Sequence, residues 1–152
     1  MVSPRAGGLK PPTSSLKAPM KRTGKESAIS LAFKNWTNCM VNLSSKNIGD
    51  QHVNEIAKNM KTYPMIRIIE LSQNKLTDKG VEHLAKAICE SAQVEQLIIS
   101  NNKLTEKCTE PLAAVLRTNK NLKVLDLQGN GISNRVFKNK ICNSLTWMDV
   151  KF

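Results

Sequence analysis

The chain has 152 residues, of which 40% are hydrophobic and 23% charged, and its formal net charge is +11. This is the length of one ordinary domain and the composition of a globular protein. No apolar run approaches the roughly 18–20 residues of a membrane-spanning helix, and the start "MVSPRAGGLKPP" lacks the apolar stretch of a secretory signal. We therefore expect a cytoplasmic protein without a membrane span.

The N-terminal segment 1–25 is rich in Pro, Gly, Ser and Lys and contains no Asp or Glu. This composition cannot form a hydrophobic core, so residues 1–25 are predicted to be a disordered or extended basic tail. A basic tail binds acidic surfaces, whether of nucleic acid, anionic lipid or protein. The predicted anchoring residues are its six cations: Arg5, Lys10, Lys17, Lys21, Arg22 and Lys25.

Residues 26–37 follow the tail and carry one apolar face. Ile29, Ala32, Phe33 and Trp36 recur at helical spacing. We predict a helix here that caps the N-terminal end of the domain.

The middle of the chain is built from segments that recur at one fixed period. The segments "IRIIELSQNKL" from Ile66, "VEQLIISNNKL" from Val94 and "LKVLDLQGNGI" from Leu122 share the pattern L-x-x-L-x-L-x-x-N-x-L. An earlier segment, "NCMVNLSSKNI" from Asn38, keeps three aliphatic residues but has Lys46 in the asparagine place. Aliphatic residues at helical spacing follow the segments from Asn38, Ile66 and Val94, so a repeat is predicted to form a strand, a turn and a helix.

The asparagines at one place in the repeat are Asn74, Asn102 and Asn130. Their amides can satisfy turn backbone groups that have no strand partner. The side chain of Lys46 cannot accept a hydrogen bond, so we expect this ladder to fray at the first repeat. Thr77, Thr105 and Ser133 are good helix N-cap residues, and acidic residues close behind them suit the helix dipole.

Over residues 38–142 this pattern resembles the leucine-rich repeats of the ribonuclease-inhibitor type. The resemblance implies an α/β fold, a short solenoid of about four strand–turn–helix repeats. A parallel sheet would lie on the concave side and helices on the convex side, with the N-terminal tail extended.

The last segment, residues 143–152, ends in "SLTWMDVKF" and contains several apolar residues. A repeat stack exposes apolar surface at its ends unless it is capped. These residues therefore form either a C-terminal cap or a segment that docks on another protein, and the sequence leaves both readings open.

The sequence carries no constellation typical of an enzyme. It contains no GxSxG, P-loop, HExxH or GxGxxG motif, and its four cysteines and two histidines are isolated from one another. We predict a non-enzymatic protein with reduced cysteines, no cofactor and no metal.

The remaining candidates lie on the surface. Strand residues that alternate with the core aliphatics face the concave side. The predicted partner-binding residues are Asn42, Ile68, Glu70, Gln96, Ile98, Val124 and Asp126. The alternative is a solvated sheet without a partner. Lysines on the convex side are either a solvated face or a contact for an acidic partner.

The resemblance implies a non-catalytic protein–protein interaction module, a structural or adaptor subunit of a larger complex anchored partly by its basic tail. By analogy with similar proteins, this complex would be ciliary or cytoskeletal, in the cilium axoneme for example, where tubulin-like surfaces are acidic. The alternative is a ribonucleoprotein subunit whose tail contacts RNA. The tail lacks aromatic side chains for base stacking, which favours a protein partner over nucleic acid.

Overall fold

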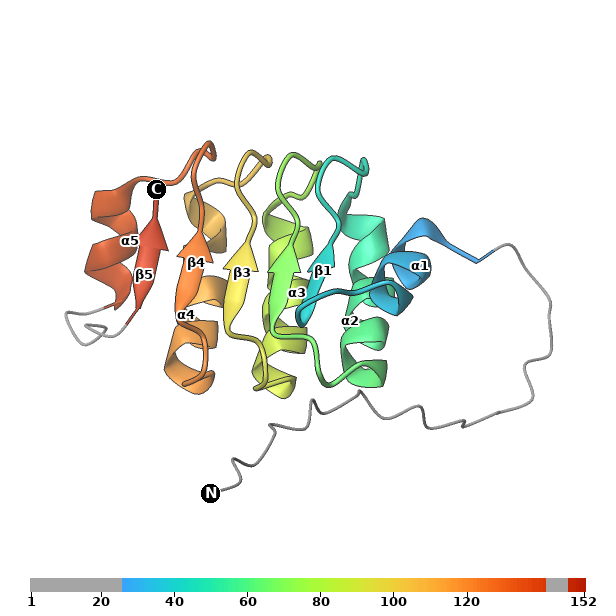
Figure 1. The fold of residues 1–152 in the computed structure, drawn as a ribbon. Helices are drawn as coiled ribbons and strands as arrows, with labels where there is room; N and C mark the ends of the chain where they lie inside the picture. Colours follow the sequence, from blue (N-terminus) through green and yellow to red (C-terminus); the bar gives the residue numbers. More distant parts are fainter. Residues whose placement is uncertain (1–25, 142–147) are drawn as a thin grey trace, which may run out of the picture.

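The computed structural model describes residues 26–141 and 148–152, and these residues form one parallel sheet covered by helices on one face. The sheet has five strands in the order β1-β2-β3-β4-β5. Figure 1 shows the strands side by side with all arrows pointing the same way and the helices packed behind them. The architecture is a short α/β repeat solenoid.

The elements follow the repeat period closely. The strands are β1 (Met40–Asn42), β2 (Ile68–Glu70), β3 (Gln96–Ile98), β4 (Val124–Asp126) and β5 (Asp149–Lys151). The helices are α1 (Ala28–Lys34), α2 (Val53–Thr62), α3 (Asp78–Glu90), α4 (Thr109–Thr118) and α5 (Asn134–Ile141). Short 3₁₀ turns, η1 (Asp50–His52) and η2 (Glu106–Cys108), precede α2 and α4. No helix among these elements is long and apolar enough to cross a bilayer.

The strands are paired without slippage across the sheet. Met40, Ile68, Gln96 and Val124 are successive Cα partners, each one full period after the last. The fifth strand breaks this spacing, because Asp149 follows its partner Val124 by less than a full period. The middle residue of each strand points into the core, and Val41, Ile69, Leu97 and Leu125 are at most 1% exposed. This alternation fixes which strand residues face away from the helices.

The two ends of the stack are covered differently. At one end, α1 packs against α2 and buries Ile29 and Phe33. The start of α1 is fixed by Glu55 of α2, whose carboxylate accepts hydrogen bonds from the hydroxyl groups of Ser27 and Ser30. At the other end, β5 pairs with β4, and the Phe152 ring meets the buried Phe137 ring edge to face at 5.3 Å. Residues 142–147 lie outside the described part of the chain.

The predicted asparagine ladder is confirmed. Asn74 donates to the carbonyl oxygens of Leu43 and Leu71, and its Oδ1 accepts from the backbone N–H groups of Lys46 and Ile48. Asn102 and Asn130 make corresponding bonds one and two repeats further on.

The predicted fraying at the first repeat is wrong. Leu43 and Ser45 still donate backbone hydrogen bonds to the next repeat, at 2.8 and 3.0 Å. The reason is that Asn74 reaches back across the repeat boundary. The first repeat therefore needs no asparagine of its own to be tied to the second.

A second set of side-chain bonds ties the repeats at the helix starts. Thr77 donates its backbone N–H to Asp50 Oδ1 at 2.9 Å, and Thr105 donates to Asp78 Oδ1 at 2.8 Å. The two threonine hydroxyl groups donate to the other oxygens of the same carboxylates. Thr77 makes no side-chain cap bond of its own, whereas Thr105 also accepts from the N–H of Lys107. The threonines and acids predicted to cap helices thus act between neighbouring repeats as well.

Candidate protein-docking surface

The side of the sheet opposite the helices, here called the outward face, consists of two rows of side chains. The first residue of each strand contributes one row, and the third residue contributes the other. The first row is Met40, Ile68, Gln96, Val124 and Asp149. The second row is Asn42, Glu70, Ile98, Asp126 and Lys151. All seven predicted partner-binding residues lie in these rows, so the pairing brings them onto one face.

The centre of the outward face is half-buried and partly apolar. Ile68, Ile98 and Val124 are each of intermediate exposure, which leaves part of each aliphatic side chain accessible. Asn42, Asp149 and Lys151 are exposed at the two ends of the rows. An apolar centre with a polar rim is the arrangement of many protein-binding surfaces.

Three of the predicted residues hold the ends of their own strands. Asn42 accepts from Ser44 N at 2.9 Å, Glu70 from Ser72 N at 2.8 Å, and Asp126 from Gln128 N at 3.0 Å. The hydroxyl groups of Ser44 and Ser72 donate to the same oxygens. These side chains thus have a structural role that reading the sequence for binding residues did not detect. The signal was available, since a polar residue recurs at this place with a partner two residues later.

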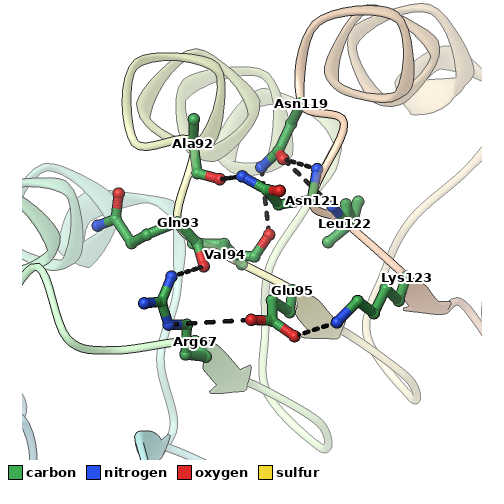
Figure 2. Close-up of polar contacts among 9 residues, drawn as sticks. All are labelled: Arg67, Ala92, Gln93, Val94, Glu95, Asn119, Asn121, Leu122 and Lys123. Atoms are coloured by element: carbon green, nitrogen blue, oxygen red, sulfur yellow. Dashed lines mark hydrogen bonds and ion pairs between the residues drawn. The ribbon is translucent and has the colours of Figure 1, made fainter.

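An ion-paired row borders the outward face just before the strands. Glu95 Oε2 lies 2.6 Å from Lys123 Nζ, and Glu95 Oε1 lies 3.9 Å from Arg67 Nε (Figure 2). The hydrogen bond and charge of Lys123, with the charge of Arg67, hold the pKa of Glu95 below its ordinary value. Glu95 therefore stays ionised at neutral pH, and it offsets one of the two positive charges of this border.

Asparagine side chains hold the loops that precede β3 and β4 in place. Asn119 Oδ1 accepts from the N–H groups of Asn121 and Leu122, and Asn121 Nδ2 donates to Ala92 O at 2.7 Å (Figure 2). Each bond joins the loop before β4 to itself or to the loop before β3. These contacts set the positions of the strand starts, and through them the rows of the outward face.

A hollow of about 320 Å³ adjoins the outward face at its N-terminal end. Met40 and Asn42 of β1 line it, together with Ala28, Leu31 and Ala32 of α1. Leu31 is 50% exposed, so about half of its aliphatic side chain is accessible at the hollow. The hollow extends the apolar part of the outward face beyond the edge of the sheet.

Metal-ligand clusters and reactive thiols are two features of catalytic sites that can be checked in the described residues. No group of three or more His, Cys, Asp or Glu side chains within residues 26–141 and 148–152 is placed to hold a metal ion. Burial raises the pKa of the Cys108 thiol to about 12, and the nearby charge of Asp78 acts in the same direction. This thiol is therefore protonated at neutral pH and is a poor nucleophile.

The other predicted surfaces are the convex side of the solenoid and the basic tail. On the convex side, Lys61, Lys86 and Arg117 are paired with Glu90, Glu82 and Glu110. The six predicted tail-anchoring residues, Arg5 to Lys25, lie outside the described residues.

Two residues of β5, Asp149 and Lys151, also lie on the outward face, although they were not among the predicted partner-binding residues. The alternation of apolar Val150 with its polar neighbours was the signal that could have found them.

Comparison with known proteins gives a match to the repeat itself. A sequence model of the leucine-rich repeat matches residues 64–85 and 118–135, which include β2 and β4. No curated protein matches the chain in sequence.

Two similar solved structures are an internalin of Listeria monocytogenes and a leucine-rich repeat protein of Leptospira interrogans. The first is 19% identical over 61% of this chain and the second 23% identical over 62%, each with a TM-score of 0.39. The matched regions are 30% and 27% of those chains, so this chain spans less than a third of either.

The two matched segments hold equivalent places in the sheet. They are separated by one further repeat, whose strand β3 pairs in register with both β2 and β4. The unit that the model matches is thus the structural unit of the sheet, and the chain carries leucine-rich repeats.

Proposed function

We propose that the chain is a non-catalytic protein-binding subunit and that its outward face is the docking surface. The observation that carries the proposal is the half-buried apolar centre, which continues into the hollow beside Leu31. Exposed apolar surface of this kind is costly unless a partner covers it. The face that a repeat solenoid turns away from its helices is also where these folds commonly bind proteins.

The polar residues of the face favour a partner that carries both apolar and basic side chains. Glu70 and Asp126 each use one carboxylate oxygen for the end of their strand, and the other oxygen has no partner among the described residues. A basic side chain of the partner would find these oxygens on either side of the apolar centre. Such complementary charges fix the orientation of a docked partner.

The test is an affinity capture with crosslinking, using the full chain in its native cells. The double variant Ile68→Glu with Ile98→Glu places charge in the apolar centre and touches no side-chain hydrogen bond of the strand ends. The control, Met65→Glu with Ala92→Glu, adds the same charge at exposed positions in loops away from the face. We expect the first variant to lose the partner, and the control to keep it with crosslinks to the outward strands. Retention by the first variant would contradict the proposal.

On a finer scale, we propose that the basic tail anchors the chain in a larger assembly, such as a cytoskeletal or ciliary complex with acidic surfaces. The six basic residues and the absence of acids in residues 1–25 support this. The alternative partner for the tail is the RNA of a ribonucleoprotein. Deletion of residues 1–25 should abolish incorporation into the assembly and leave thermal stability nearly unchanged. Full incorporation of the shortened chain would exclude an anchoring role.

A further inference from the structure

The edge of the solenoid where the strands end is positively charged and is distinct from the outward face. This turn edge comprises the turns after β1 to β4 and the first two residues of the helical segment that follows each turn, namely η1, α3, η2 and α5 (Figure 1). Six exposed cations belong to it. They are Lys46, Lys75, Lys79, Lys103, Lys107 and Arg135.

The cations of the turn edge have no acidic side-chain partner within the described ranges. The ion pairs formed by the described residues use other cations, namely Lys34, Lys61, Arg67, Lys86, Arg117 and Lys123. The undescribed segments 1–25 and 142–147 contain no Asp or Glu and so cannot supply side-chain partners. Four described cations outside the edge, Lys58, Lys138, Lys140 and Lys151, are in none of these ion pairs either. The turn edge therefore stands out by the stacking of six such cations along one edge.

The fold holds these cations close to one another. Lys75 donates its backbone N–H to Ile48 O at 2.8 Å, and Lys103 donates to Leu76 O at 2.9 Å. Successive turns therefore stack at the spacing of the sheet, about 4.8 Å, which is well within the Debye length. Like charges at this separation repel each other, and binding of an anion relieves that repulsion.

Few carboxylates oppose the cations on this edge. Asp50 and Asp78 lie there, but their oxygens accept hydrogen bonds from Thr77 and Thr105. Glu106 is the third, and it is exposed between Lys103 and Lys107. The edge thus carries more positive than negative charge, and one acidic residue in each of the first three repeats interrupts the row of cations.

We infer that the turn edge binds an acidic polypeptide segment. A partner with spaced carboxylates can lie along the lysines and avoid the interrupting acids, whereas the uniform charge of a nucleic-acid backbone cannot. The six cations are accompanied on the edge by small polar side chains such as Ser72, Ser100 and Asn101, which provide no aromatic ring for base stacking. The lysines act as point charges, which suits single carboxylates.

The test compares two variants of the full chain that lose the same number of positive charges. The edge variant carries Lys75→Gln, Lys79→Gln, Lys103→Gln and Lys107→Gln. The control variant carries Lys58→Gln, Lys61→Gln, Lys86→Gln and Arg117→Gln on the convex side. The basic tail is present in both, so a difference between the variants reports on the edge. Thermal melting by circular dichroism verifies that both are folded.

Binding is measured by fluorescence anisotropy of a labelled peptide of alternating glutamate and glycine, and in parallel of a labelled DNA duplex. At about 0.1 M salt we expect the edge variant to bind the peptide about tenfold more weakly, and the control to change less than about twofold. Equal losses in the two variants would overturn the inference, because net charge alone would explain them. Unchanged peptide binding by the edge variant, or a dependence on the edge seen only with DNA, would overturn it too. None of these outcomes bears on the outward face, which the variants leave intact.

Discussion

The Asn74 amide connects two neighbouring turns through five hydrogen bonds. Its nitrogen donates to the carbonyl oxygens of Leu43, Leu71 and Ser72, and its oxygen accepts from Lys46 and Ile48. The residue is only 8% exposed, so water cannot replace these partners if the amide is removed. Buried backbone groups without partners are costly, which makes this side chain structural although it is polar.

Asn74→Ala should therefore lower the free energy of unfolding by about 3 kcal/mol, because several buried backbone groups lose their partner together. Urea unfolding followed by circular dichroism measures the change. Asn54→Ala is the matched control, since Asn54 is exposed on α2, and its effect should stay within about 0.5 kcal/mol. Equal effects of the two substitutions would show that the ladder contributes little.

The left-handed residues of the turns show what the repeat pattern does not reveal. Ser45, Gln73, Asn101 and Gly129 hold the same place in successive repeats and have φ values of 54°, 54°, 51° and 66°. The asparagine that follows in three of the repeats is visible in the sequence, but these residues share no side-chain type. Only Gly129 is a glycine, and a Cβ there would lie 2.2 Å from Asn101 Oδ1. Different residue types adopt the positive φ at this place, so a search for a recurring residue type could not find it.

The same limit applies to the candidate site. The period-two alternation of the strands predicted which residues face outward, and the pairing confirms that Ile68, Gln96 and Val124 are neighbours. The hydrogen bonds of Glu70 and Asp126 to the residues two positions on were not predicted. These bonds depend on how the backbone turns after the strand, and the aliphatic pattern carries no information about that turn.

At the scale of elements, β5 covers one end of the sheet with a strand outside the repeat pattern. Residues 148–152 have neither the asparagine nor the leucine spacing of a repeat, and the strand begins before a full period is complete. Its place in the sheet depends on contacts with β4 and α5 rather than on a local pattern. Leu127 N donates to Lys151 O at 2.8 Å, and Phe152 packs against Phe137. This long-range dependence is why the sequence left a cap and a docking segment as open alternatives.

Phe152→Ala should destabilise the fold by about 2 kcal/mol, because it removes a ring that shields the buried Phe137. The measurement is the shift of the urea unfolding midpoint. Lys151→Ala, one residue earlier on an exposed side chain, serves as the control and should change stability by less than about 0.5 kcal/mol. A Phe152 variant as stable as the original chain would mean that the edge-to-face contact does not support the end of the stack.

At the scale of the whole molecule, stability is shared between neighbours along the stack. Among the residues that the structure describes, each inner strand pairs on both sides, whereas β1 and β5 pair on one side only. Helix α3 buries six residues, and α5 buries one, Phe137. In a repeat protein the folding free energy is close to a sum over units and the interfaces between them, so the ends are the weaker parts.

Native-state hydrogen exchange should accordingly be slowest in the amides of β2 to β4 and fastest in α5, because α5 has the fewest buried contacts. Mass spectrometry of peptides from the exchanged protein measures the order. Helix α3 is an internal reference of high burial. Protection of α5 equal to that of α3 would indicate that the stack opens only as a single unit.

Because the register of the first four strands is constant, the repeat array can be lengthened by whole repeats. Each repeat presents to the next the same backbone carbonyl acceptors, to which the asparagine of the next repeat donates, and the first two repeats also present a carboxylate to the next threonine. A tandem duplication of residues 66–93 would therefore insert a unit whose two sides fit the neighbours already there. An insertion of one full period would lengthen the outward face by one strand and keep the register on both of its sides.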